Sequence, residues 1–328
     1  MGKESFDIGS SIDDDPYQNE HVQSVPFLAY YITELITTGA STTVSKTTVA
    51  PLERIKILMQ TRAEGFHSIG MYGSMKKLMK NEGLRGLYKA NGVSIIRTLP
   101  HSIFQYVTYE QYQSFLQYKW PRVERGPLLD ILASSAASAT GFLCTYPLDL
   151  ARTKYAYQVV DRHQSSGDYR KCIHSGHTAQ RGVTNVFMTI YNQGGILGFY
   201  RGVGPTLGGI LPYNVIKFYG YEKLKRWVPK ENRSSVALNL SCGALAALIG
   251  QTVMYPLDVV RRQMQVDIPN QNGTRYKNSI EAFKSIIRNQ GWRQLYAGLC
   301  INYIKVVPSI AIGLTAFDVI DRQLHFPR

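Results

Sequence analysis

One short motif occurs three times in the chain, and its repetition constrains the fold more than any other feature. Each copy reads proline, any residue, an acid, two further residues and a base. The copies occupy residues 51–56, 147–152 and 256–261, roughly a hundred residues apart. One copy would carry little information, but three copies at this spacing predict a single structural unit that is used three times.

A second segment of each unit keeps the same register. Each motif is followed by an aromatic residue after a glycine-containing turn, at Tyr88, Tyr200 and Tyr296. The motif proline and this aromatic residue are 37, 53 and 40 residues apart, so the middle unit carries an extra loop. We therefore expect three repeats, at residues 26–122, 123–230 and 231–328. The acid-rich residues 1–25 lack the composition of a transit peptide, and we expect a disordered acidic tail there.

Each repeat contains two apolar segments long enough to cross a bilayer. Residues 236–257 hold no charge over 22 residues and residues 131–148 none over 18, near the ~20 residues that a membrane-spanning helix needs. Small residues lie one helical turn apart in both, which permits close helix packing in lipid. Four further segments, at about 28–60, 91–118, 202–226 and 298–322, are apolar but carry isolated charges. This pattern predicts an all-α membrane protein with six transmembrane helices; the alternative is a soluble helical bundle with alanine-rich faces.

The charge balance and the cysteines exclude several other classes. The net charge is +14, but no basic stripe or nucleic-acid-binding module is present, so we expect no nucleic-acid partner. The basic residues instead lie beside the apolar segments, as suits anionic lipid headgroups or a polyanionic ligand. The four cysteines show no paired spacing, which argues against a disulfide framework. Cys172, His174 and His177 offer too few ligands for a convincing zinc site, and we expect no metal or other cofactor.

The repeated motif places an acid and a base three residues apart on a helix that its proline bends. Because an unpaired charge inside a membrane is costly, each must find a partner. The two charges of one helix could pair with each other. Alternatively, the acid of one repeat pairs with the base of the next, and the three pairs close a ring that plugs one end of a three-fold barrel. The ring would consist of Glu53–Arg152, Asp149–Arg261 and Asp258–Lys56, with helix kinks at Pro51, Pro147 and Pro256, and with Gln60 and Gln265 as braces beneath it, where the middle repeat has Ala156.

A related pattern lies near the far end of the second helix of each repeat. It reads aromatic residue, acid, two residues and base, and only the copy with Glu222 and Lys225 is complete. Gln113 and Asp321 stand in place of the base after Glu110 and Asp318. We therefore expect a second gate that is much weaker than the first.

Between these two sets of charges, three positions lie at equal depth in the register: Arg97, Gly209 and Lys305. The two cations suit phosphate groups, and the bare backbone of Gly209 beside Ile210 would accept a planar ring. Packing alone could explain the glycine, but it does not explain an arginine and a lysine embedded in a membrane. The pattern predicts an anionic ligand with a flat part. Further polar contacts could come from Gln105, Tyr213 and Asn214.

On these motifs the chain resembles the mitochondrial carrier family over about residues 28–325. The resemblance implies a multi-pass transporter of the mitochondrial inner membrane that alternates between states closed by the first ring, the matrix gate, and by the second, the cytoplasmic gate. It also implies short matrix-side helices, at 72–80, 184–193 and 279–290, anionic lipids such as cardiolipin as partners, and a monomer. The chain departs from the family pattern at Ala90, where a glycine is usual, and at Gly194 and Gln290, which replace the acid that Glu82 supplies in the first repeat.

Within the family, segments 49–58, 143–154, 255–265 and 301–308 resemble the coenzyme A carriers, especially those of plants. The stretch 261–265 departs from the run found in ADP/ATP carriers, which makes adenine-nucleotide exchange the alternative function. No catalytic constellation is visible, so we do not expect an enzyme. A non-transporting protein that kept the fold is a third class: the weakened second gate favours it, and Arg97 and Lys305 argue against it.

Overall fold

The computed structural model describes residues 27–324, apart from residues 64, 67–68, 121–125, 160–181, 230–235, 268–275 and 277. Within these residues the chain forms helices and no strand, which confirms the all-α prediction. The expected tail at residues 1–25, Cys172, His174 and His177 lie outside the described residues. Six helices are long: α1 (Phe27–Gln60), α4 (Asn91–Lys119), α5 (Pro127–Tyr157), α7 (Val203–Trp227), α8 (Val236–Val266) and α10 (Leu299–Leu324).

The helices agree with the predicted apolar segments, except that two of them are longer. Helices α5 and α8 continue well beyond the charge-free stretches 131–148 and 236–257, through the motif prolines and the charged residues that follow them. A proline removes one backbone hydrogen bond, and a membrane helix tolerates this because neighbouring helices satisfy the freed group. The motif charges therefore lie inside helices rather than in loops.

Hydropathy alone identifies only part of the membrane-spanning set. Among the described residues, three helical stretches combine sufficient length with a high mean hydropathy, namely Pro127–Tyr157, Leu238–Val266 and Trp292–Gln323, with values of 1.4, 1.4 and 1.6. Helices α1 and α7 are of similar length but carry more charged residues, five each, and α4 carries three charges among many polar residues. Several of those charges belong to the site described below.

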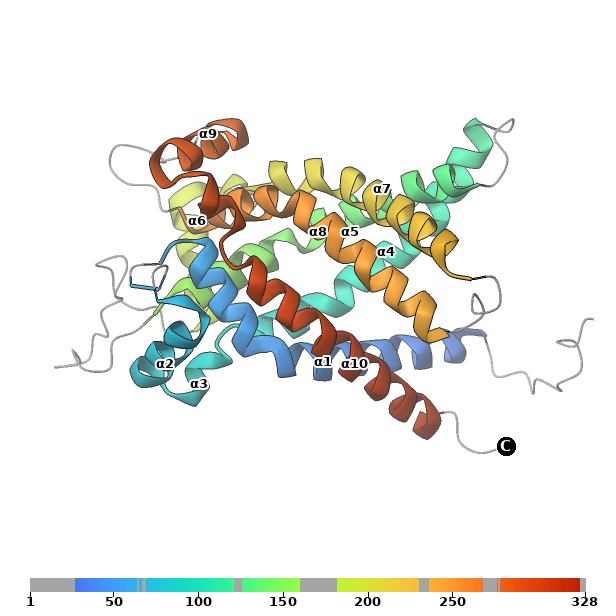
Figure 1. The fold of residues 1–328 in the computed structure, drawn as a ribbon, viewed down its shortest axis with the longest axis horizontal. Helices are drawn as coiled ribbons and strands as arrows, with labels where there is room; N and C mark the ends of the chain where they lie inside the picture. Colours follow the sequence, from blue (N-terminus) through green and yellow to red (C-terminus); the bar gives the residue numbers. More distant parts are fainter. Residues whose placement is uncertain are drawn as a thin grey trace, which may run out of the picture.

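The six long helices form a closed ring. Successive repeats are joined where α4 packs against α5 and α7 against α8, and α10 returns to pack against α1. Within the repeats, α1 also contacts α4, α5 contacts α7 and α8 contacts α10. The closing contact between α10 and α1 includes a hydrogen bond of 2.6 Å from the Ser45 hydroxyl to the Ser309 carbonyl oxygen. Figure 1 shows these two helices side by side.

The shorter helices gather at one end of the ring, which we call the short-helix end (Figure 1). Each repeat has a left-handed glycine in this region, Gly83, Gly195 and Gly291, with φ of 73°, 58° and 84°. The predicted short helices at 72–80, 184–193 and 279–290 are all present, and the one in the middle repeat is broken at Gly195, before a further turn that runs to Gly198. The elements are α2 (Gly70–Glu82), α3 (Leu84–Leu87), α6 (Val183–Gly198), α9 (Ser279–Gln290) and the 3₁₀ helix η2 (Trp292–Tyr296).

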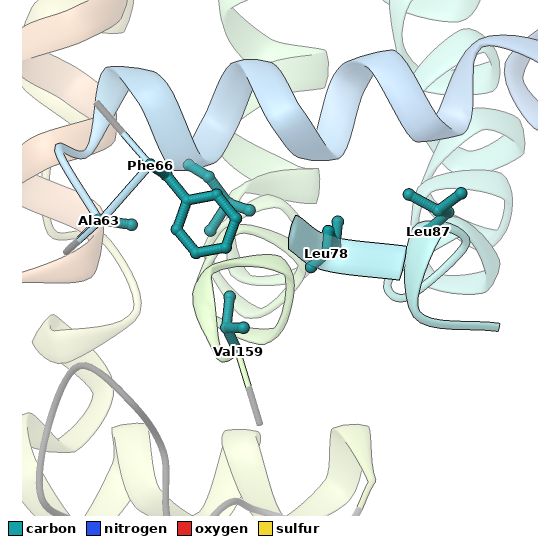
Figure 2. Packing of buried hydrophobic residues seen from close by; sticks show 6 residues of the cluster. Ala63, Phe66, Leu78, Leu87 and Val159 are labelled. Carbon is teal, nitrogen blue, oxygen red and sulfur yellow. The ribbon is translucent and has the colours of Figure 1, made fainter. Parts of the chain in front are cut away.

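The hydrophobic core is concentrated at this same end, in three larger clusters and a smaller one formed by Ile57, Ala90 and Ala156. The first cluster packs Phe66 and Leu78 with Leu58, Ala63, Leu87 and Val159 (Figure 2). Two further clusters surround Tyr146 and Val260. In contrast, the buried residues of α4 are only Val93 and Ser94, at its first turn. The buried core is therefore concentrated at the short-helix end, whereas the remaining side chains of α4 are exposed or half-buried although the helix packs along α5.

Candidate functional site

Three ion pairs join α1, α5 and α8 at the short-helix end. Each pair unites the acid of one repeat with the base of another, so the structure contains the predicted ring rather than pairs within one helix. The pairs are Glu53–Arg152, Asp149–Arg261 with 2.5 Å between Oδ2 and Nη2, and Asp258–Lys56 with 3.0 Å between Oδ2 and Nζ.

The motif explains why these charges meet. The acid and the base lie three residues apart, on one face of their helix, and both follow the proline that interrupts the backbone ladder. The hydrophobic clusters of the short helices hold the three helix ends together at this level. Whether the ring opens during function is a separate matter, and its role as a gate remains a prediction.

Two of the three pairs are held by a glutamine, as the sequence predicted. Gln60 donates a hydrogen bond of 3.0 Å to Oδ2 of Asp258, and Gln265 donates one of 3.0 Å to Oδ2 of Asp149. Each glutamine lies four residues after the base of its pair. At the Glu53–Arg152 pair this position is Ala156, whose methyl side chain cannot donate a hydrogen bond.

Arg262 is a fourth cation of the ring that the sequence analysis missed. Its Nη1 lies 3.3 Å from Oδ2 of Asp149, and its Nε lies 3.9 Å from Oδ1 of Asp258. Arg262 therefore bridges two pairs of the ring. The only signal in the sequence was the doubled arginine, because the equivalent positions in the other repeats are Ile57 and Thr153.

The two cations predicted to bind substrate contact the acids of the ring. Nη1 of Arg97 lies 3.5 Å from Oδ1 of Asp149, and Nζ of Lys305 donates a hydrogen bond of 3.2 Å to Oε1 of Glu53. Among the described residues, Nη1 of Arg97 finds no hydrogen-bond partner although it is buried. This nitrogen therefore has the Asp149 carboxylate as its ion-pair partner but makes no hydrogen bond, and a buried donor without a hydrogen bond is costly.

Three further residues reach the same region from equivalent positions, five residues before each motif proline: Lys46, Phe142 and Gln251. Lys46 donates a hydrogen bond to the hydroxyl of Thr98 and interacts electrostatically with Glu53 and Asp149. Phe142 carries two guanidinium groups on its ring, with Arg97 at 5.0 Å and Arg261 at 4.8 Å from its centroid. The sequence analysis missed all three residues, although the threefold register would have identified the position.

Gly209 is not required by packing. A Cβ atom added there would lie 3.5 Å from Cδ1 of Leu257, an ordinary van der Waals contact. A glycine inside a helix costs roughly 0.5–1 kcal/mol relative to alanine, so its presence without a steric need favours a role for the bare backbone. Ile210 beside it is half-buried, as a wall for a flat ligand would be.

Gln105, Asn214 and Tyr213, which were predicted to add polar contacts to the ligand, each contact a neighbouring helix in this structure. Gln105 of α4 donates to the hydroxyl of Ser138 at 3.3 Å, and Asn214 of α7 donates to that of Ser135 at 3.0 Å. Both serines lie on α5. Tyr213 packs on α8, where a Cβ added at Gly250 would lie 3.2 Å from its ring. Direct substrate contact by these residues remains a prediction.

The second set of charges forms no ring in this structure. Among the described residues, Glu110, Glu222, Lys225 and Asp318 make no ion pair with one another, and Nζ of Lys225 instead lies 5.6 Å from the ring centroid of Tyr221. The short-helix end is thus the one that ion pairs close. Within the part of the chain that the structure describes, no group of three or more metal-binding side chains is found.

Known proteins are similar to the chain along most of its length. The mitochondrial carrier protein family matches residues 29–120, 124–232 and 232–327. Mitochondrial carrier protein CoAc1 of Arabidopsis thaliana is 49% identical over 316 residues, which cover 93% of this chain and 93% of that protein. Mitochondrial carrier protein CoAc1 of Zea mays is 50% identical over 316 residues, 94% of this chain and 91% of that protein. Mitochondrial adenine nucleotide transporter ADNT1 of Arabidopsis thaliana is 33% identical over 311 residues, 86% of this chain and 84% of that protein.

Proposed function

Because the chain belongs to the mitochondrial carrier protein family, we propose that it transports coenzyme A by alternating access. Members of this family are transporters, and the chain is a multi-pass protein of the mitochondrial inner membrane. The relatives that share about half of its residues are named mitochondrial carrier protein CoAc1, and we interpret that name as denoting a coenzyme A carrier. The proposal transfers that substrate to this chain and assigns roles to its own residues.

The observation that carries the proposal is a surplus of positive charge around the ring. Among the described residues, seven cations surround the three ring acids, which leaves four cations in excess. The 3′-phosphate and the diphosphate of coenzyme A together carry about four negative charges near pH 7. The cations are Lys46, Lys56, Arg97, Arg152, Arg261, Arg262 and Lys305.

The contacts of Arg97 and Lys305 suggest how binding opens the ring. Both cations neutralise ring acids in this state, since Arg97 lies on Asp149 and Lys305 on Glu53. Substrate phosphates would compete with those two carboxylates for the same cations. Binding therefore weakens the ring directly, and the interaction energy with the ligand offsets the loss of the ion pairs. The adenine ring would meanwhile lie against Gly209 and Ile210.

The proposal also includes anionic lipids as partners at the membrane surface. Lys76, Lys80 and Arg85 are exposed on α2 and α3 at the short-helix end. Exposed cations at this level suit the phosphates of an anionic lipid such as cardiolipin. A monomer is sufficient for transport, because one chain closes the ring of six helices by itself.

An adenine nucleotide is the alternative substrate. The similarity to ADNT1, at 33% identity, supports it, and ADP offers the same adenine and diphosphate groups as coenzyme A. The adenine and diphosphate groups therefore do not separate the two candidates. The greater similarity to the CoAc proteins is what favours coenzyme A.

Uptake into liposomes tests the proposal. Purified protein is reconstituted, and uptake of labelled coenzyme A and labelled ADP is measured from the same preparation. We expect uptake of coenzyme A well above that of ADP. Uptake of ADP alone would replace the proposal by adenine-nucleotide exchange, and uptake of neither would refute both assignments.

A further inference from the structure

The three junctions of the ring are not equivalent. Two of them have a glutamine that donates to the ring acid, whereas the junction of Glu53 and Arg152, which we call the first junction, has Ala156 at that position. A small cavity lies at this point, and Glu53, Arg152 and Ala156 are among the residues that line it. The first junction therefore lacks the hydrogen bond that supports the other two.

Arg54 lies at the wall of the same cavity and joins the two repeats there. Its side chain is only 1% exposed. Its Nε donates a hydrogen bond of 3.1 Å to the Ala156 carbonyl oxygen, and its Nη2 donates one of 2.9 Å to the Gln158 carbonyl oxygen. Both acceptors belong to the last turn of α5 and the residue after it, where helix carbonyls have no partner within the helix and a cation is favourable.

The other half of the guanidinium group is held by its own repeat. Its Nη1 lies 2.5 Å from Oε2 of Glu82 and also donates to the Gly86 carbonyl oxygen. A Cβ added at Gly86 would lie 2.4 Å from Cβ of Glu82 and 3.4 Å from Nη1 of Arg54. Glycine at position 86 therefore leaves room for the Glu82 side chain and for the guanidinium group of Arg54.

Lys89 reinforces this link from the same repeat. Its Nζ donates a hydrogen bond of 2.8 Å to the Gln158 carbonyl oxygen and lies 5.0 Å from the ring centroid of Tyr155. Together the two cations make three hydrogen bonds from the first repeat to the end of α5.

No equivalent of Arg54 is present in the other repeats. The corresponding positions, one residue after the ring acid, are Leu150 and Val259, which are buried apolar residues. The acid that faces Arg54 is also peculiar to the first repeat, because Gly194 and Gln290 occupy the positions equivalent to Glu82. The buried arginine and the missing glutamine thus occur at the same junction and at no other one.

We propose that Arg54 is the positioning residue of the first junction: it holds the end of α5 against α1 and so sets how readily the Glu53–Arg152 pair opens. In this way it performs the task that Gln60 and Gln265 perform at the other junctions. The inference rests on the proposed role of the ring as the matrix gate.

A measurable consequence is a change in apparent affinity. Loss of the link raises the population of carriers that are open at the matrix side, and this leaves fewer that accept substrate from the cytosolic side. The apparent KM rises by the factor by which the competent population falls. For Arg54→Gln we expect KM for cytosolic-side uptake to rise about three- to tenfold, and the melting temperature in detergent to fall by several degrees.

The decisive variant restores the glutamine that the first junction lacks. Ala156→Gln introduces an amide four residues after Arg152, the spacing from which Gln60 and Gln265 reach the other two ring acids, and the buried cluster of Ile57, Ala90 and Ala156 must shift to admit it. In the Arg54→Gln protein it is expected to recover most of the lost melting temperature and most of the change in KM. Alone, Ala156→Gln should raise the melting temperature and lower the maximal uptake rate. This single variant still tests the proposal if Arg54→Gln does not fold.

Lys77→Gln is the matched control. Lys77 donates to the Gly65 carbonyl oxygen at 3.1 Å, entirely within the first repeat, so Ala156→Gln should not rescue its loss. The proposal is overturned if Ala156→Gln fails to improve Arg54→Gln, or if it improves Lys77→Gln equally. Thermal unfolding is followed by tryptophan fluorescence without substrate, so a failure to transport coenzyme A would refute the proposed function and leave this comparison intact.

Discussion

Single residues of the ring carry unequal numbers of contacts, and Asp149 is the most heavily engaged. Its carboxylate interacts with Arg97, Arg261 and Arg262, accepts a hydrogen bond from Gln265, and is only 2% exposed. A buried charge is tolerated when several partners compensate for the loss of hydration. The ring is therefore strongest at Asp149, and the removal of one of its partners leaves the others in place.

The first prediction concerns Arg97. Arg97→Ala is expected to abolish uptake while the protein stays folded, because Asp149 retains Arg261 at 2.5 Å and Arg262 at 3.3 Å. Uptake and thermal unfolding are measured on the same preparation. Arg288→Ala, which removes an exposed cation of α9, serves as the control and should leave uptake unchanged. Undiminished transport by Arg97→Ala would refute its assignment to the substrate site.

The sequence predicted those site residues that obey the threefold repeat. The three ion pairs form as predicted, because their residues recur at a fixed spacing from a motif proline. Arg97 and Lys305 were identified by their fixed spacing from an aromatic residue, and their binding of substrate stays a prediction. Arg54 and Arg262 were missed because each occurs in one repeat only, and a residue without a counterpart gives no periodic signal. Their roles become visible only when the structure shows which carbonyl and carboxylate oxygens lie beside them.

At the level of the elements, the start of α4 differs from the starts of α7 and α10. In the second and third repeats a left-handed glycine precedes the helix, Gly202 and Gly298, each with φ of 81°. In the second repeat, the tyrosine before the motif proline, Tyr146, donates a hydrogen bond of 2.8 Å to the backbone beside that glycine. The first repeat has Ala90 with φ of 73°, and Ala50 in place of the tyrosine. A methyl group is accommodated there because no tyrosine hydroxyl occupies the space.

The second prediction follows from this backbone conformation. A left-handed conformation costs an L-residue roughly 1–2 kcal/mol, whereas glycine adopts it freely but loses about 0.5–1 kcal/mol in chain entropy. Ala90→Gly relieves this strain but also removes a buried methyl group from the cluster of Ile57 and Ala156, which costs about 0.8 kcal/mol, so the midpoint of thermal unfolding is expected to stay nearly unchanged.

Gly202→Ala is the converse substitution. A Cβ at this position would lie 3.2 Å from the Arg261 carbonyl oxygen, from Cβ of Met264 and from the Tyr146 hydroxyl oxygen. It should therefore destabilise the protein by more than the strain of φ alone. Equal unfolding midpoints for Ala90→Gly, Gly202→Ala and the unchanged protein would contradict this account.

The elements themselves were largely predictable, with an instructive exception in α5 and α8. The length of an uncharged run predicts the part of a helix that lies in lipid, but these helices extend through the charged motif to the end of the core. The extension depends on tertiary partners for the charges, which composition alone does not reveal. The register, by contrast, predicted the ends of the second helices within two residues.

For the whole molecule, the two ends of the ring differ in the strength of their charge sets. The short-helix end has three cross-repeat ion pairs. At the other end, among the described residues, Glu110, Glu222 and Asp318 form no such pairs. The structure therefore represents a state closed at the short-helix end. The sequence alone does not select this state, because both sets of charges are encoded in the same chain.

The third prediction concerns variants that add ion pairs to the second set of charges, at the end of the ring opposite the short helices. Gln113→Lys combined with Asp321→Lys supplies the two bases that are missing from the second set. Exposed ion pairs contribute up to about 1 kcal/mol, which shifts a conformational equilibrium roughly fivefold. We expect a higher KM and a lower maximal rate for uptake from the cytosolic side, because the state closed on that side becomes more populated.

A control with two lysines elsewhere on the same two helices, which adds two positive charges against three, tests for gating apart from general electrostatics. Gln111→Lys with Gln323→Lys places lysines at exposed positions of the same two helices, outside the acid-base pattern. This variant should transport like the unchanged protein. If both double variants behave alike, the second set of charges does not act as a gate.

The closing contact between α10 and α1 also determines the order in which the chain can complete its fold. Ser45 and Ser309 are separated by 264 residues, and the bond between them joins the first long helix to the last. Contacts at such a separation form late, because the intervening chain must be ordered first. Until α10 has been inserted, the face of α1 that it covers has no protein neighbour and must be shielded by lipid or by another protein. Biogenesis of this transporter is therefore incomplete until its final helix is made, however well the earlier repeats have packed.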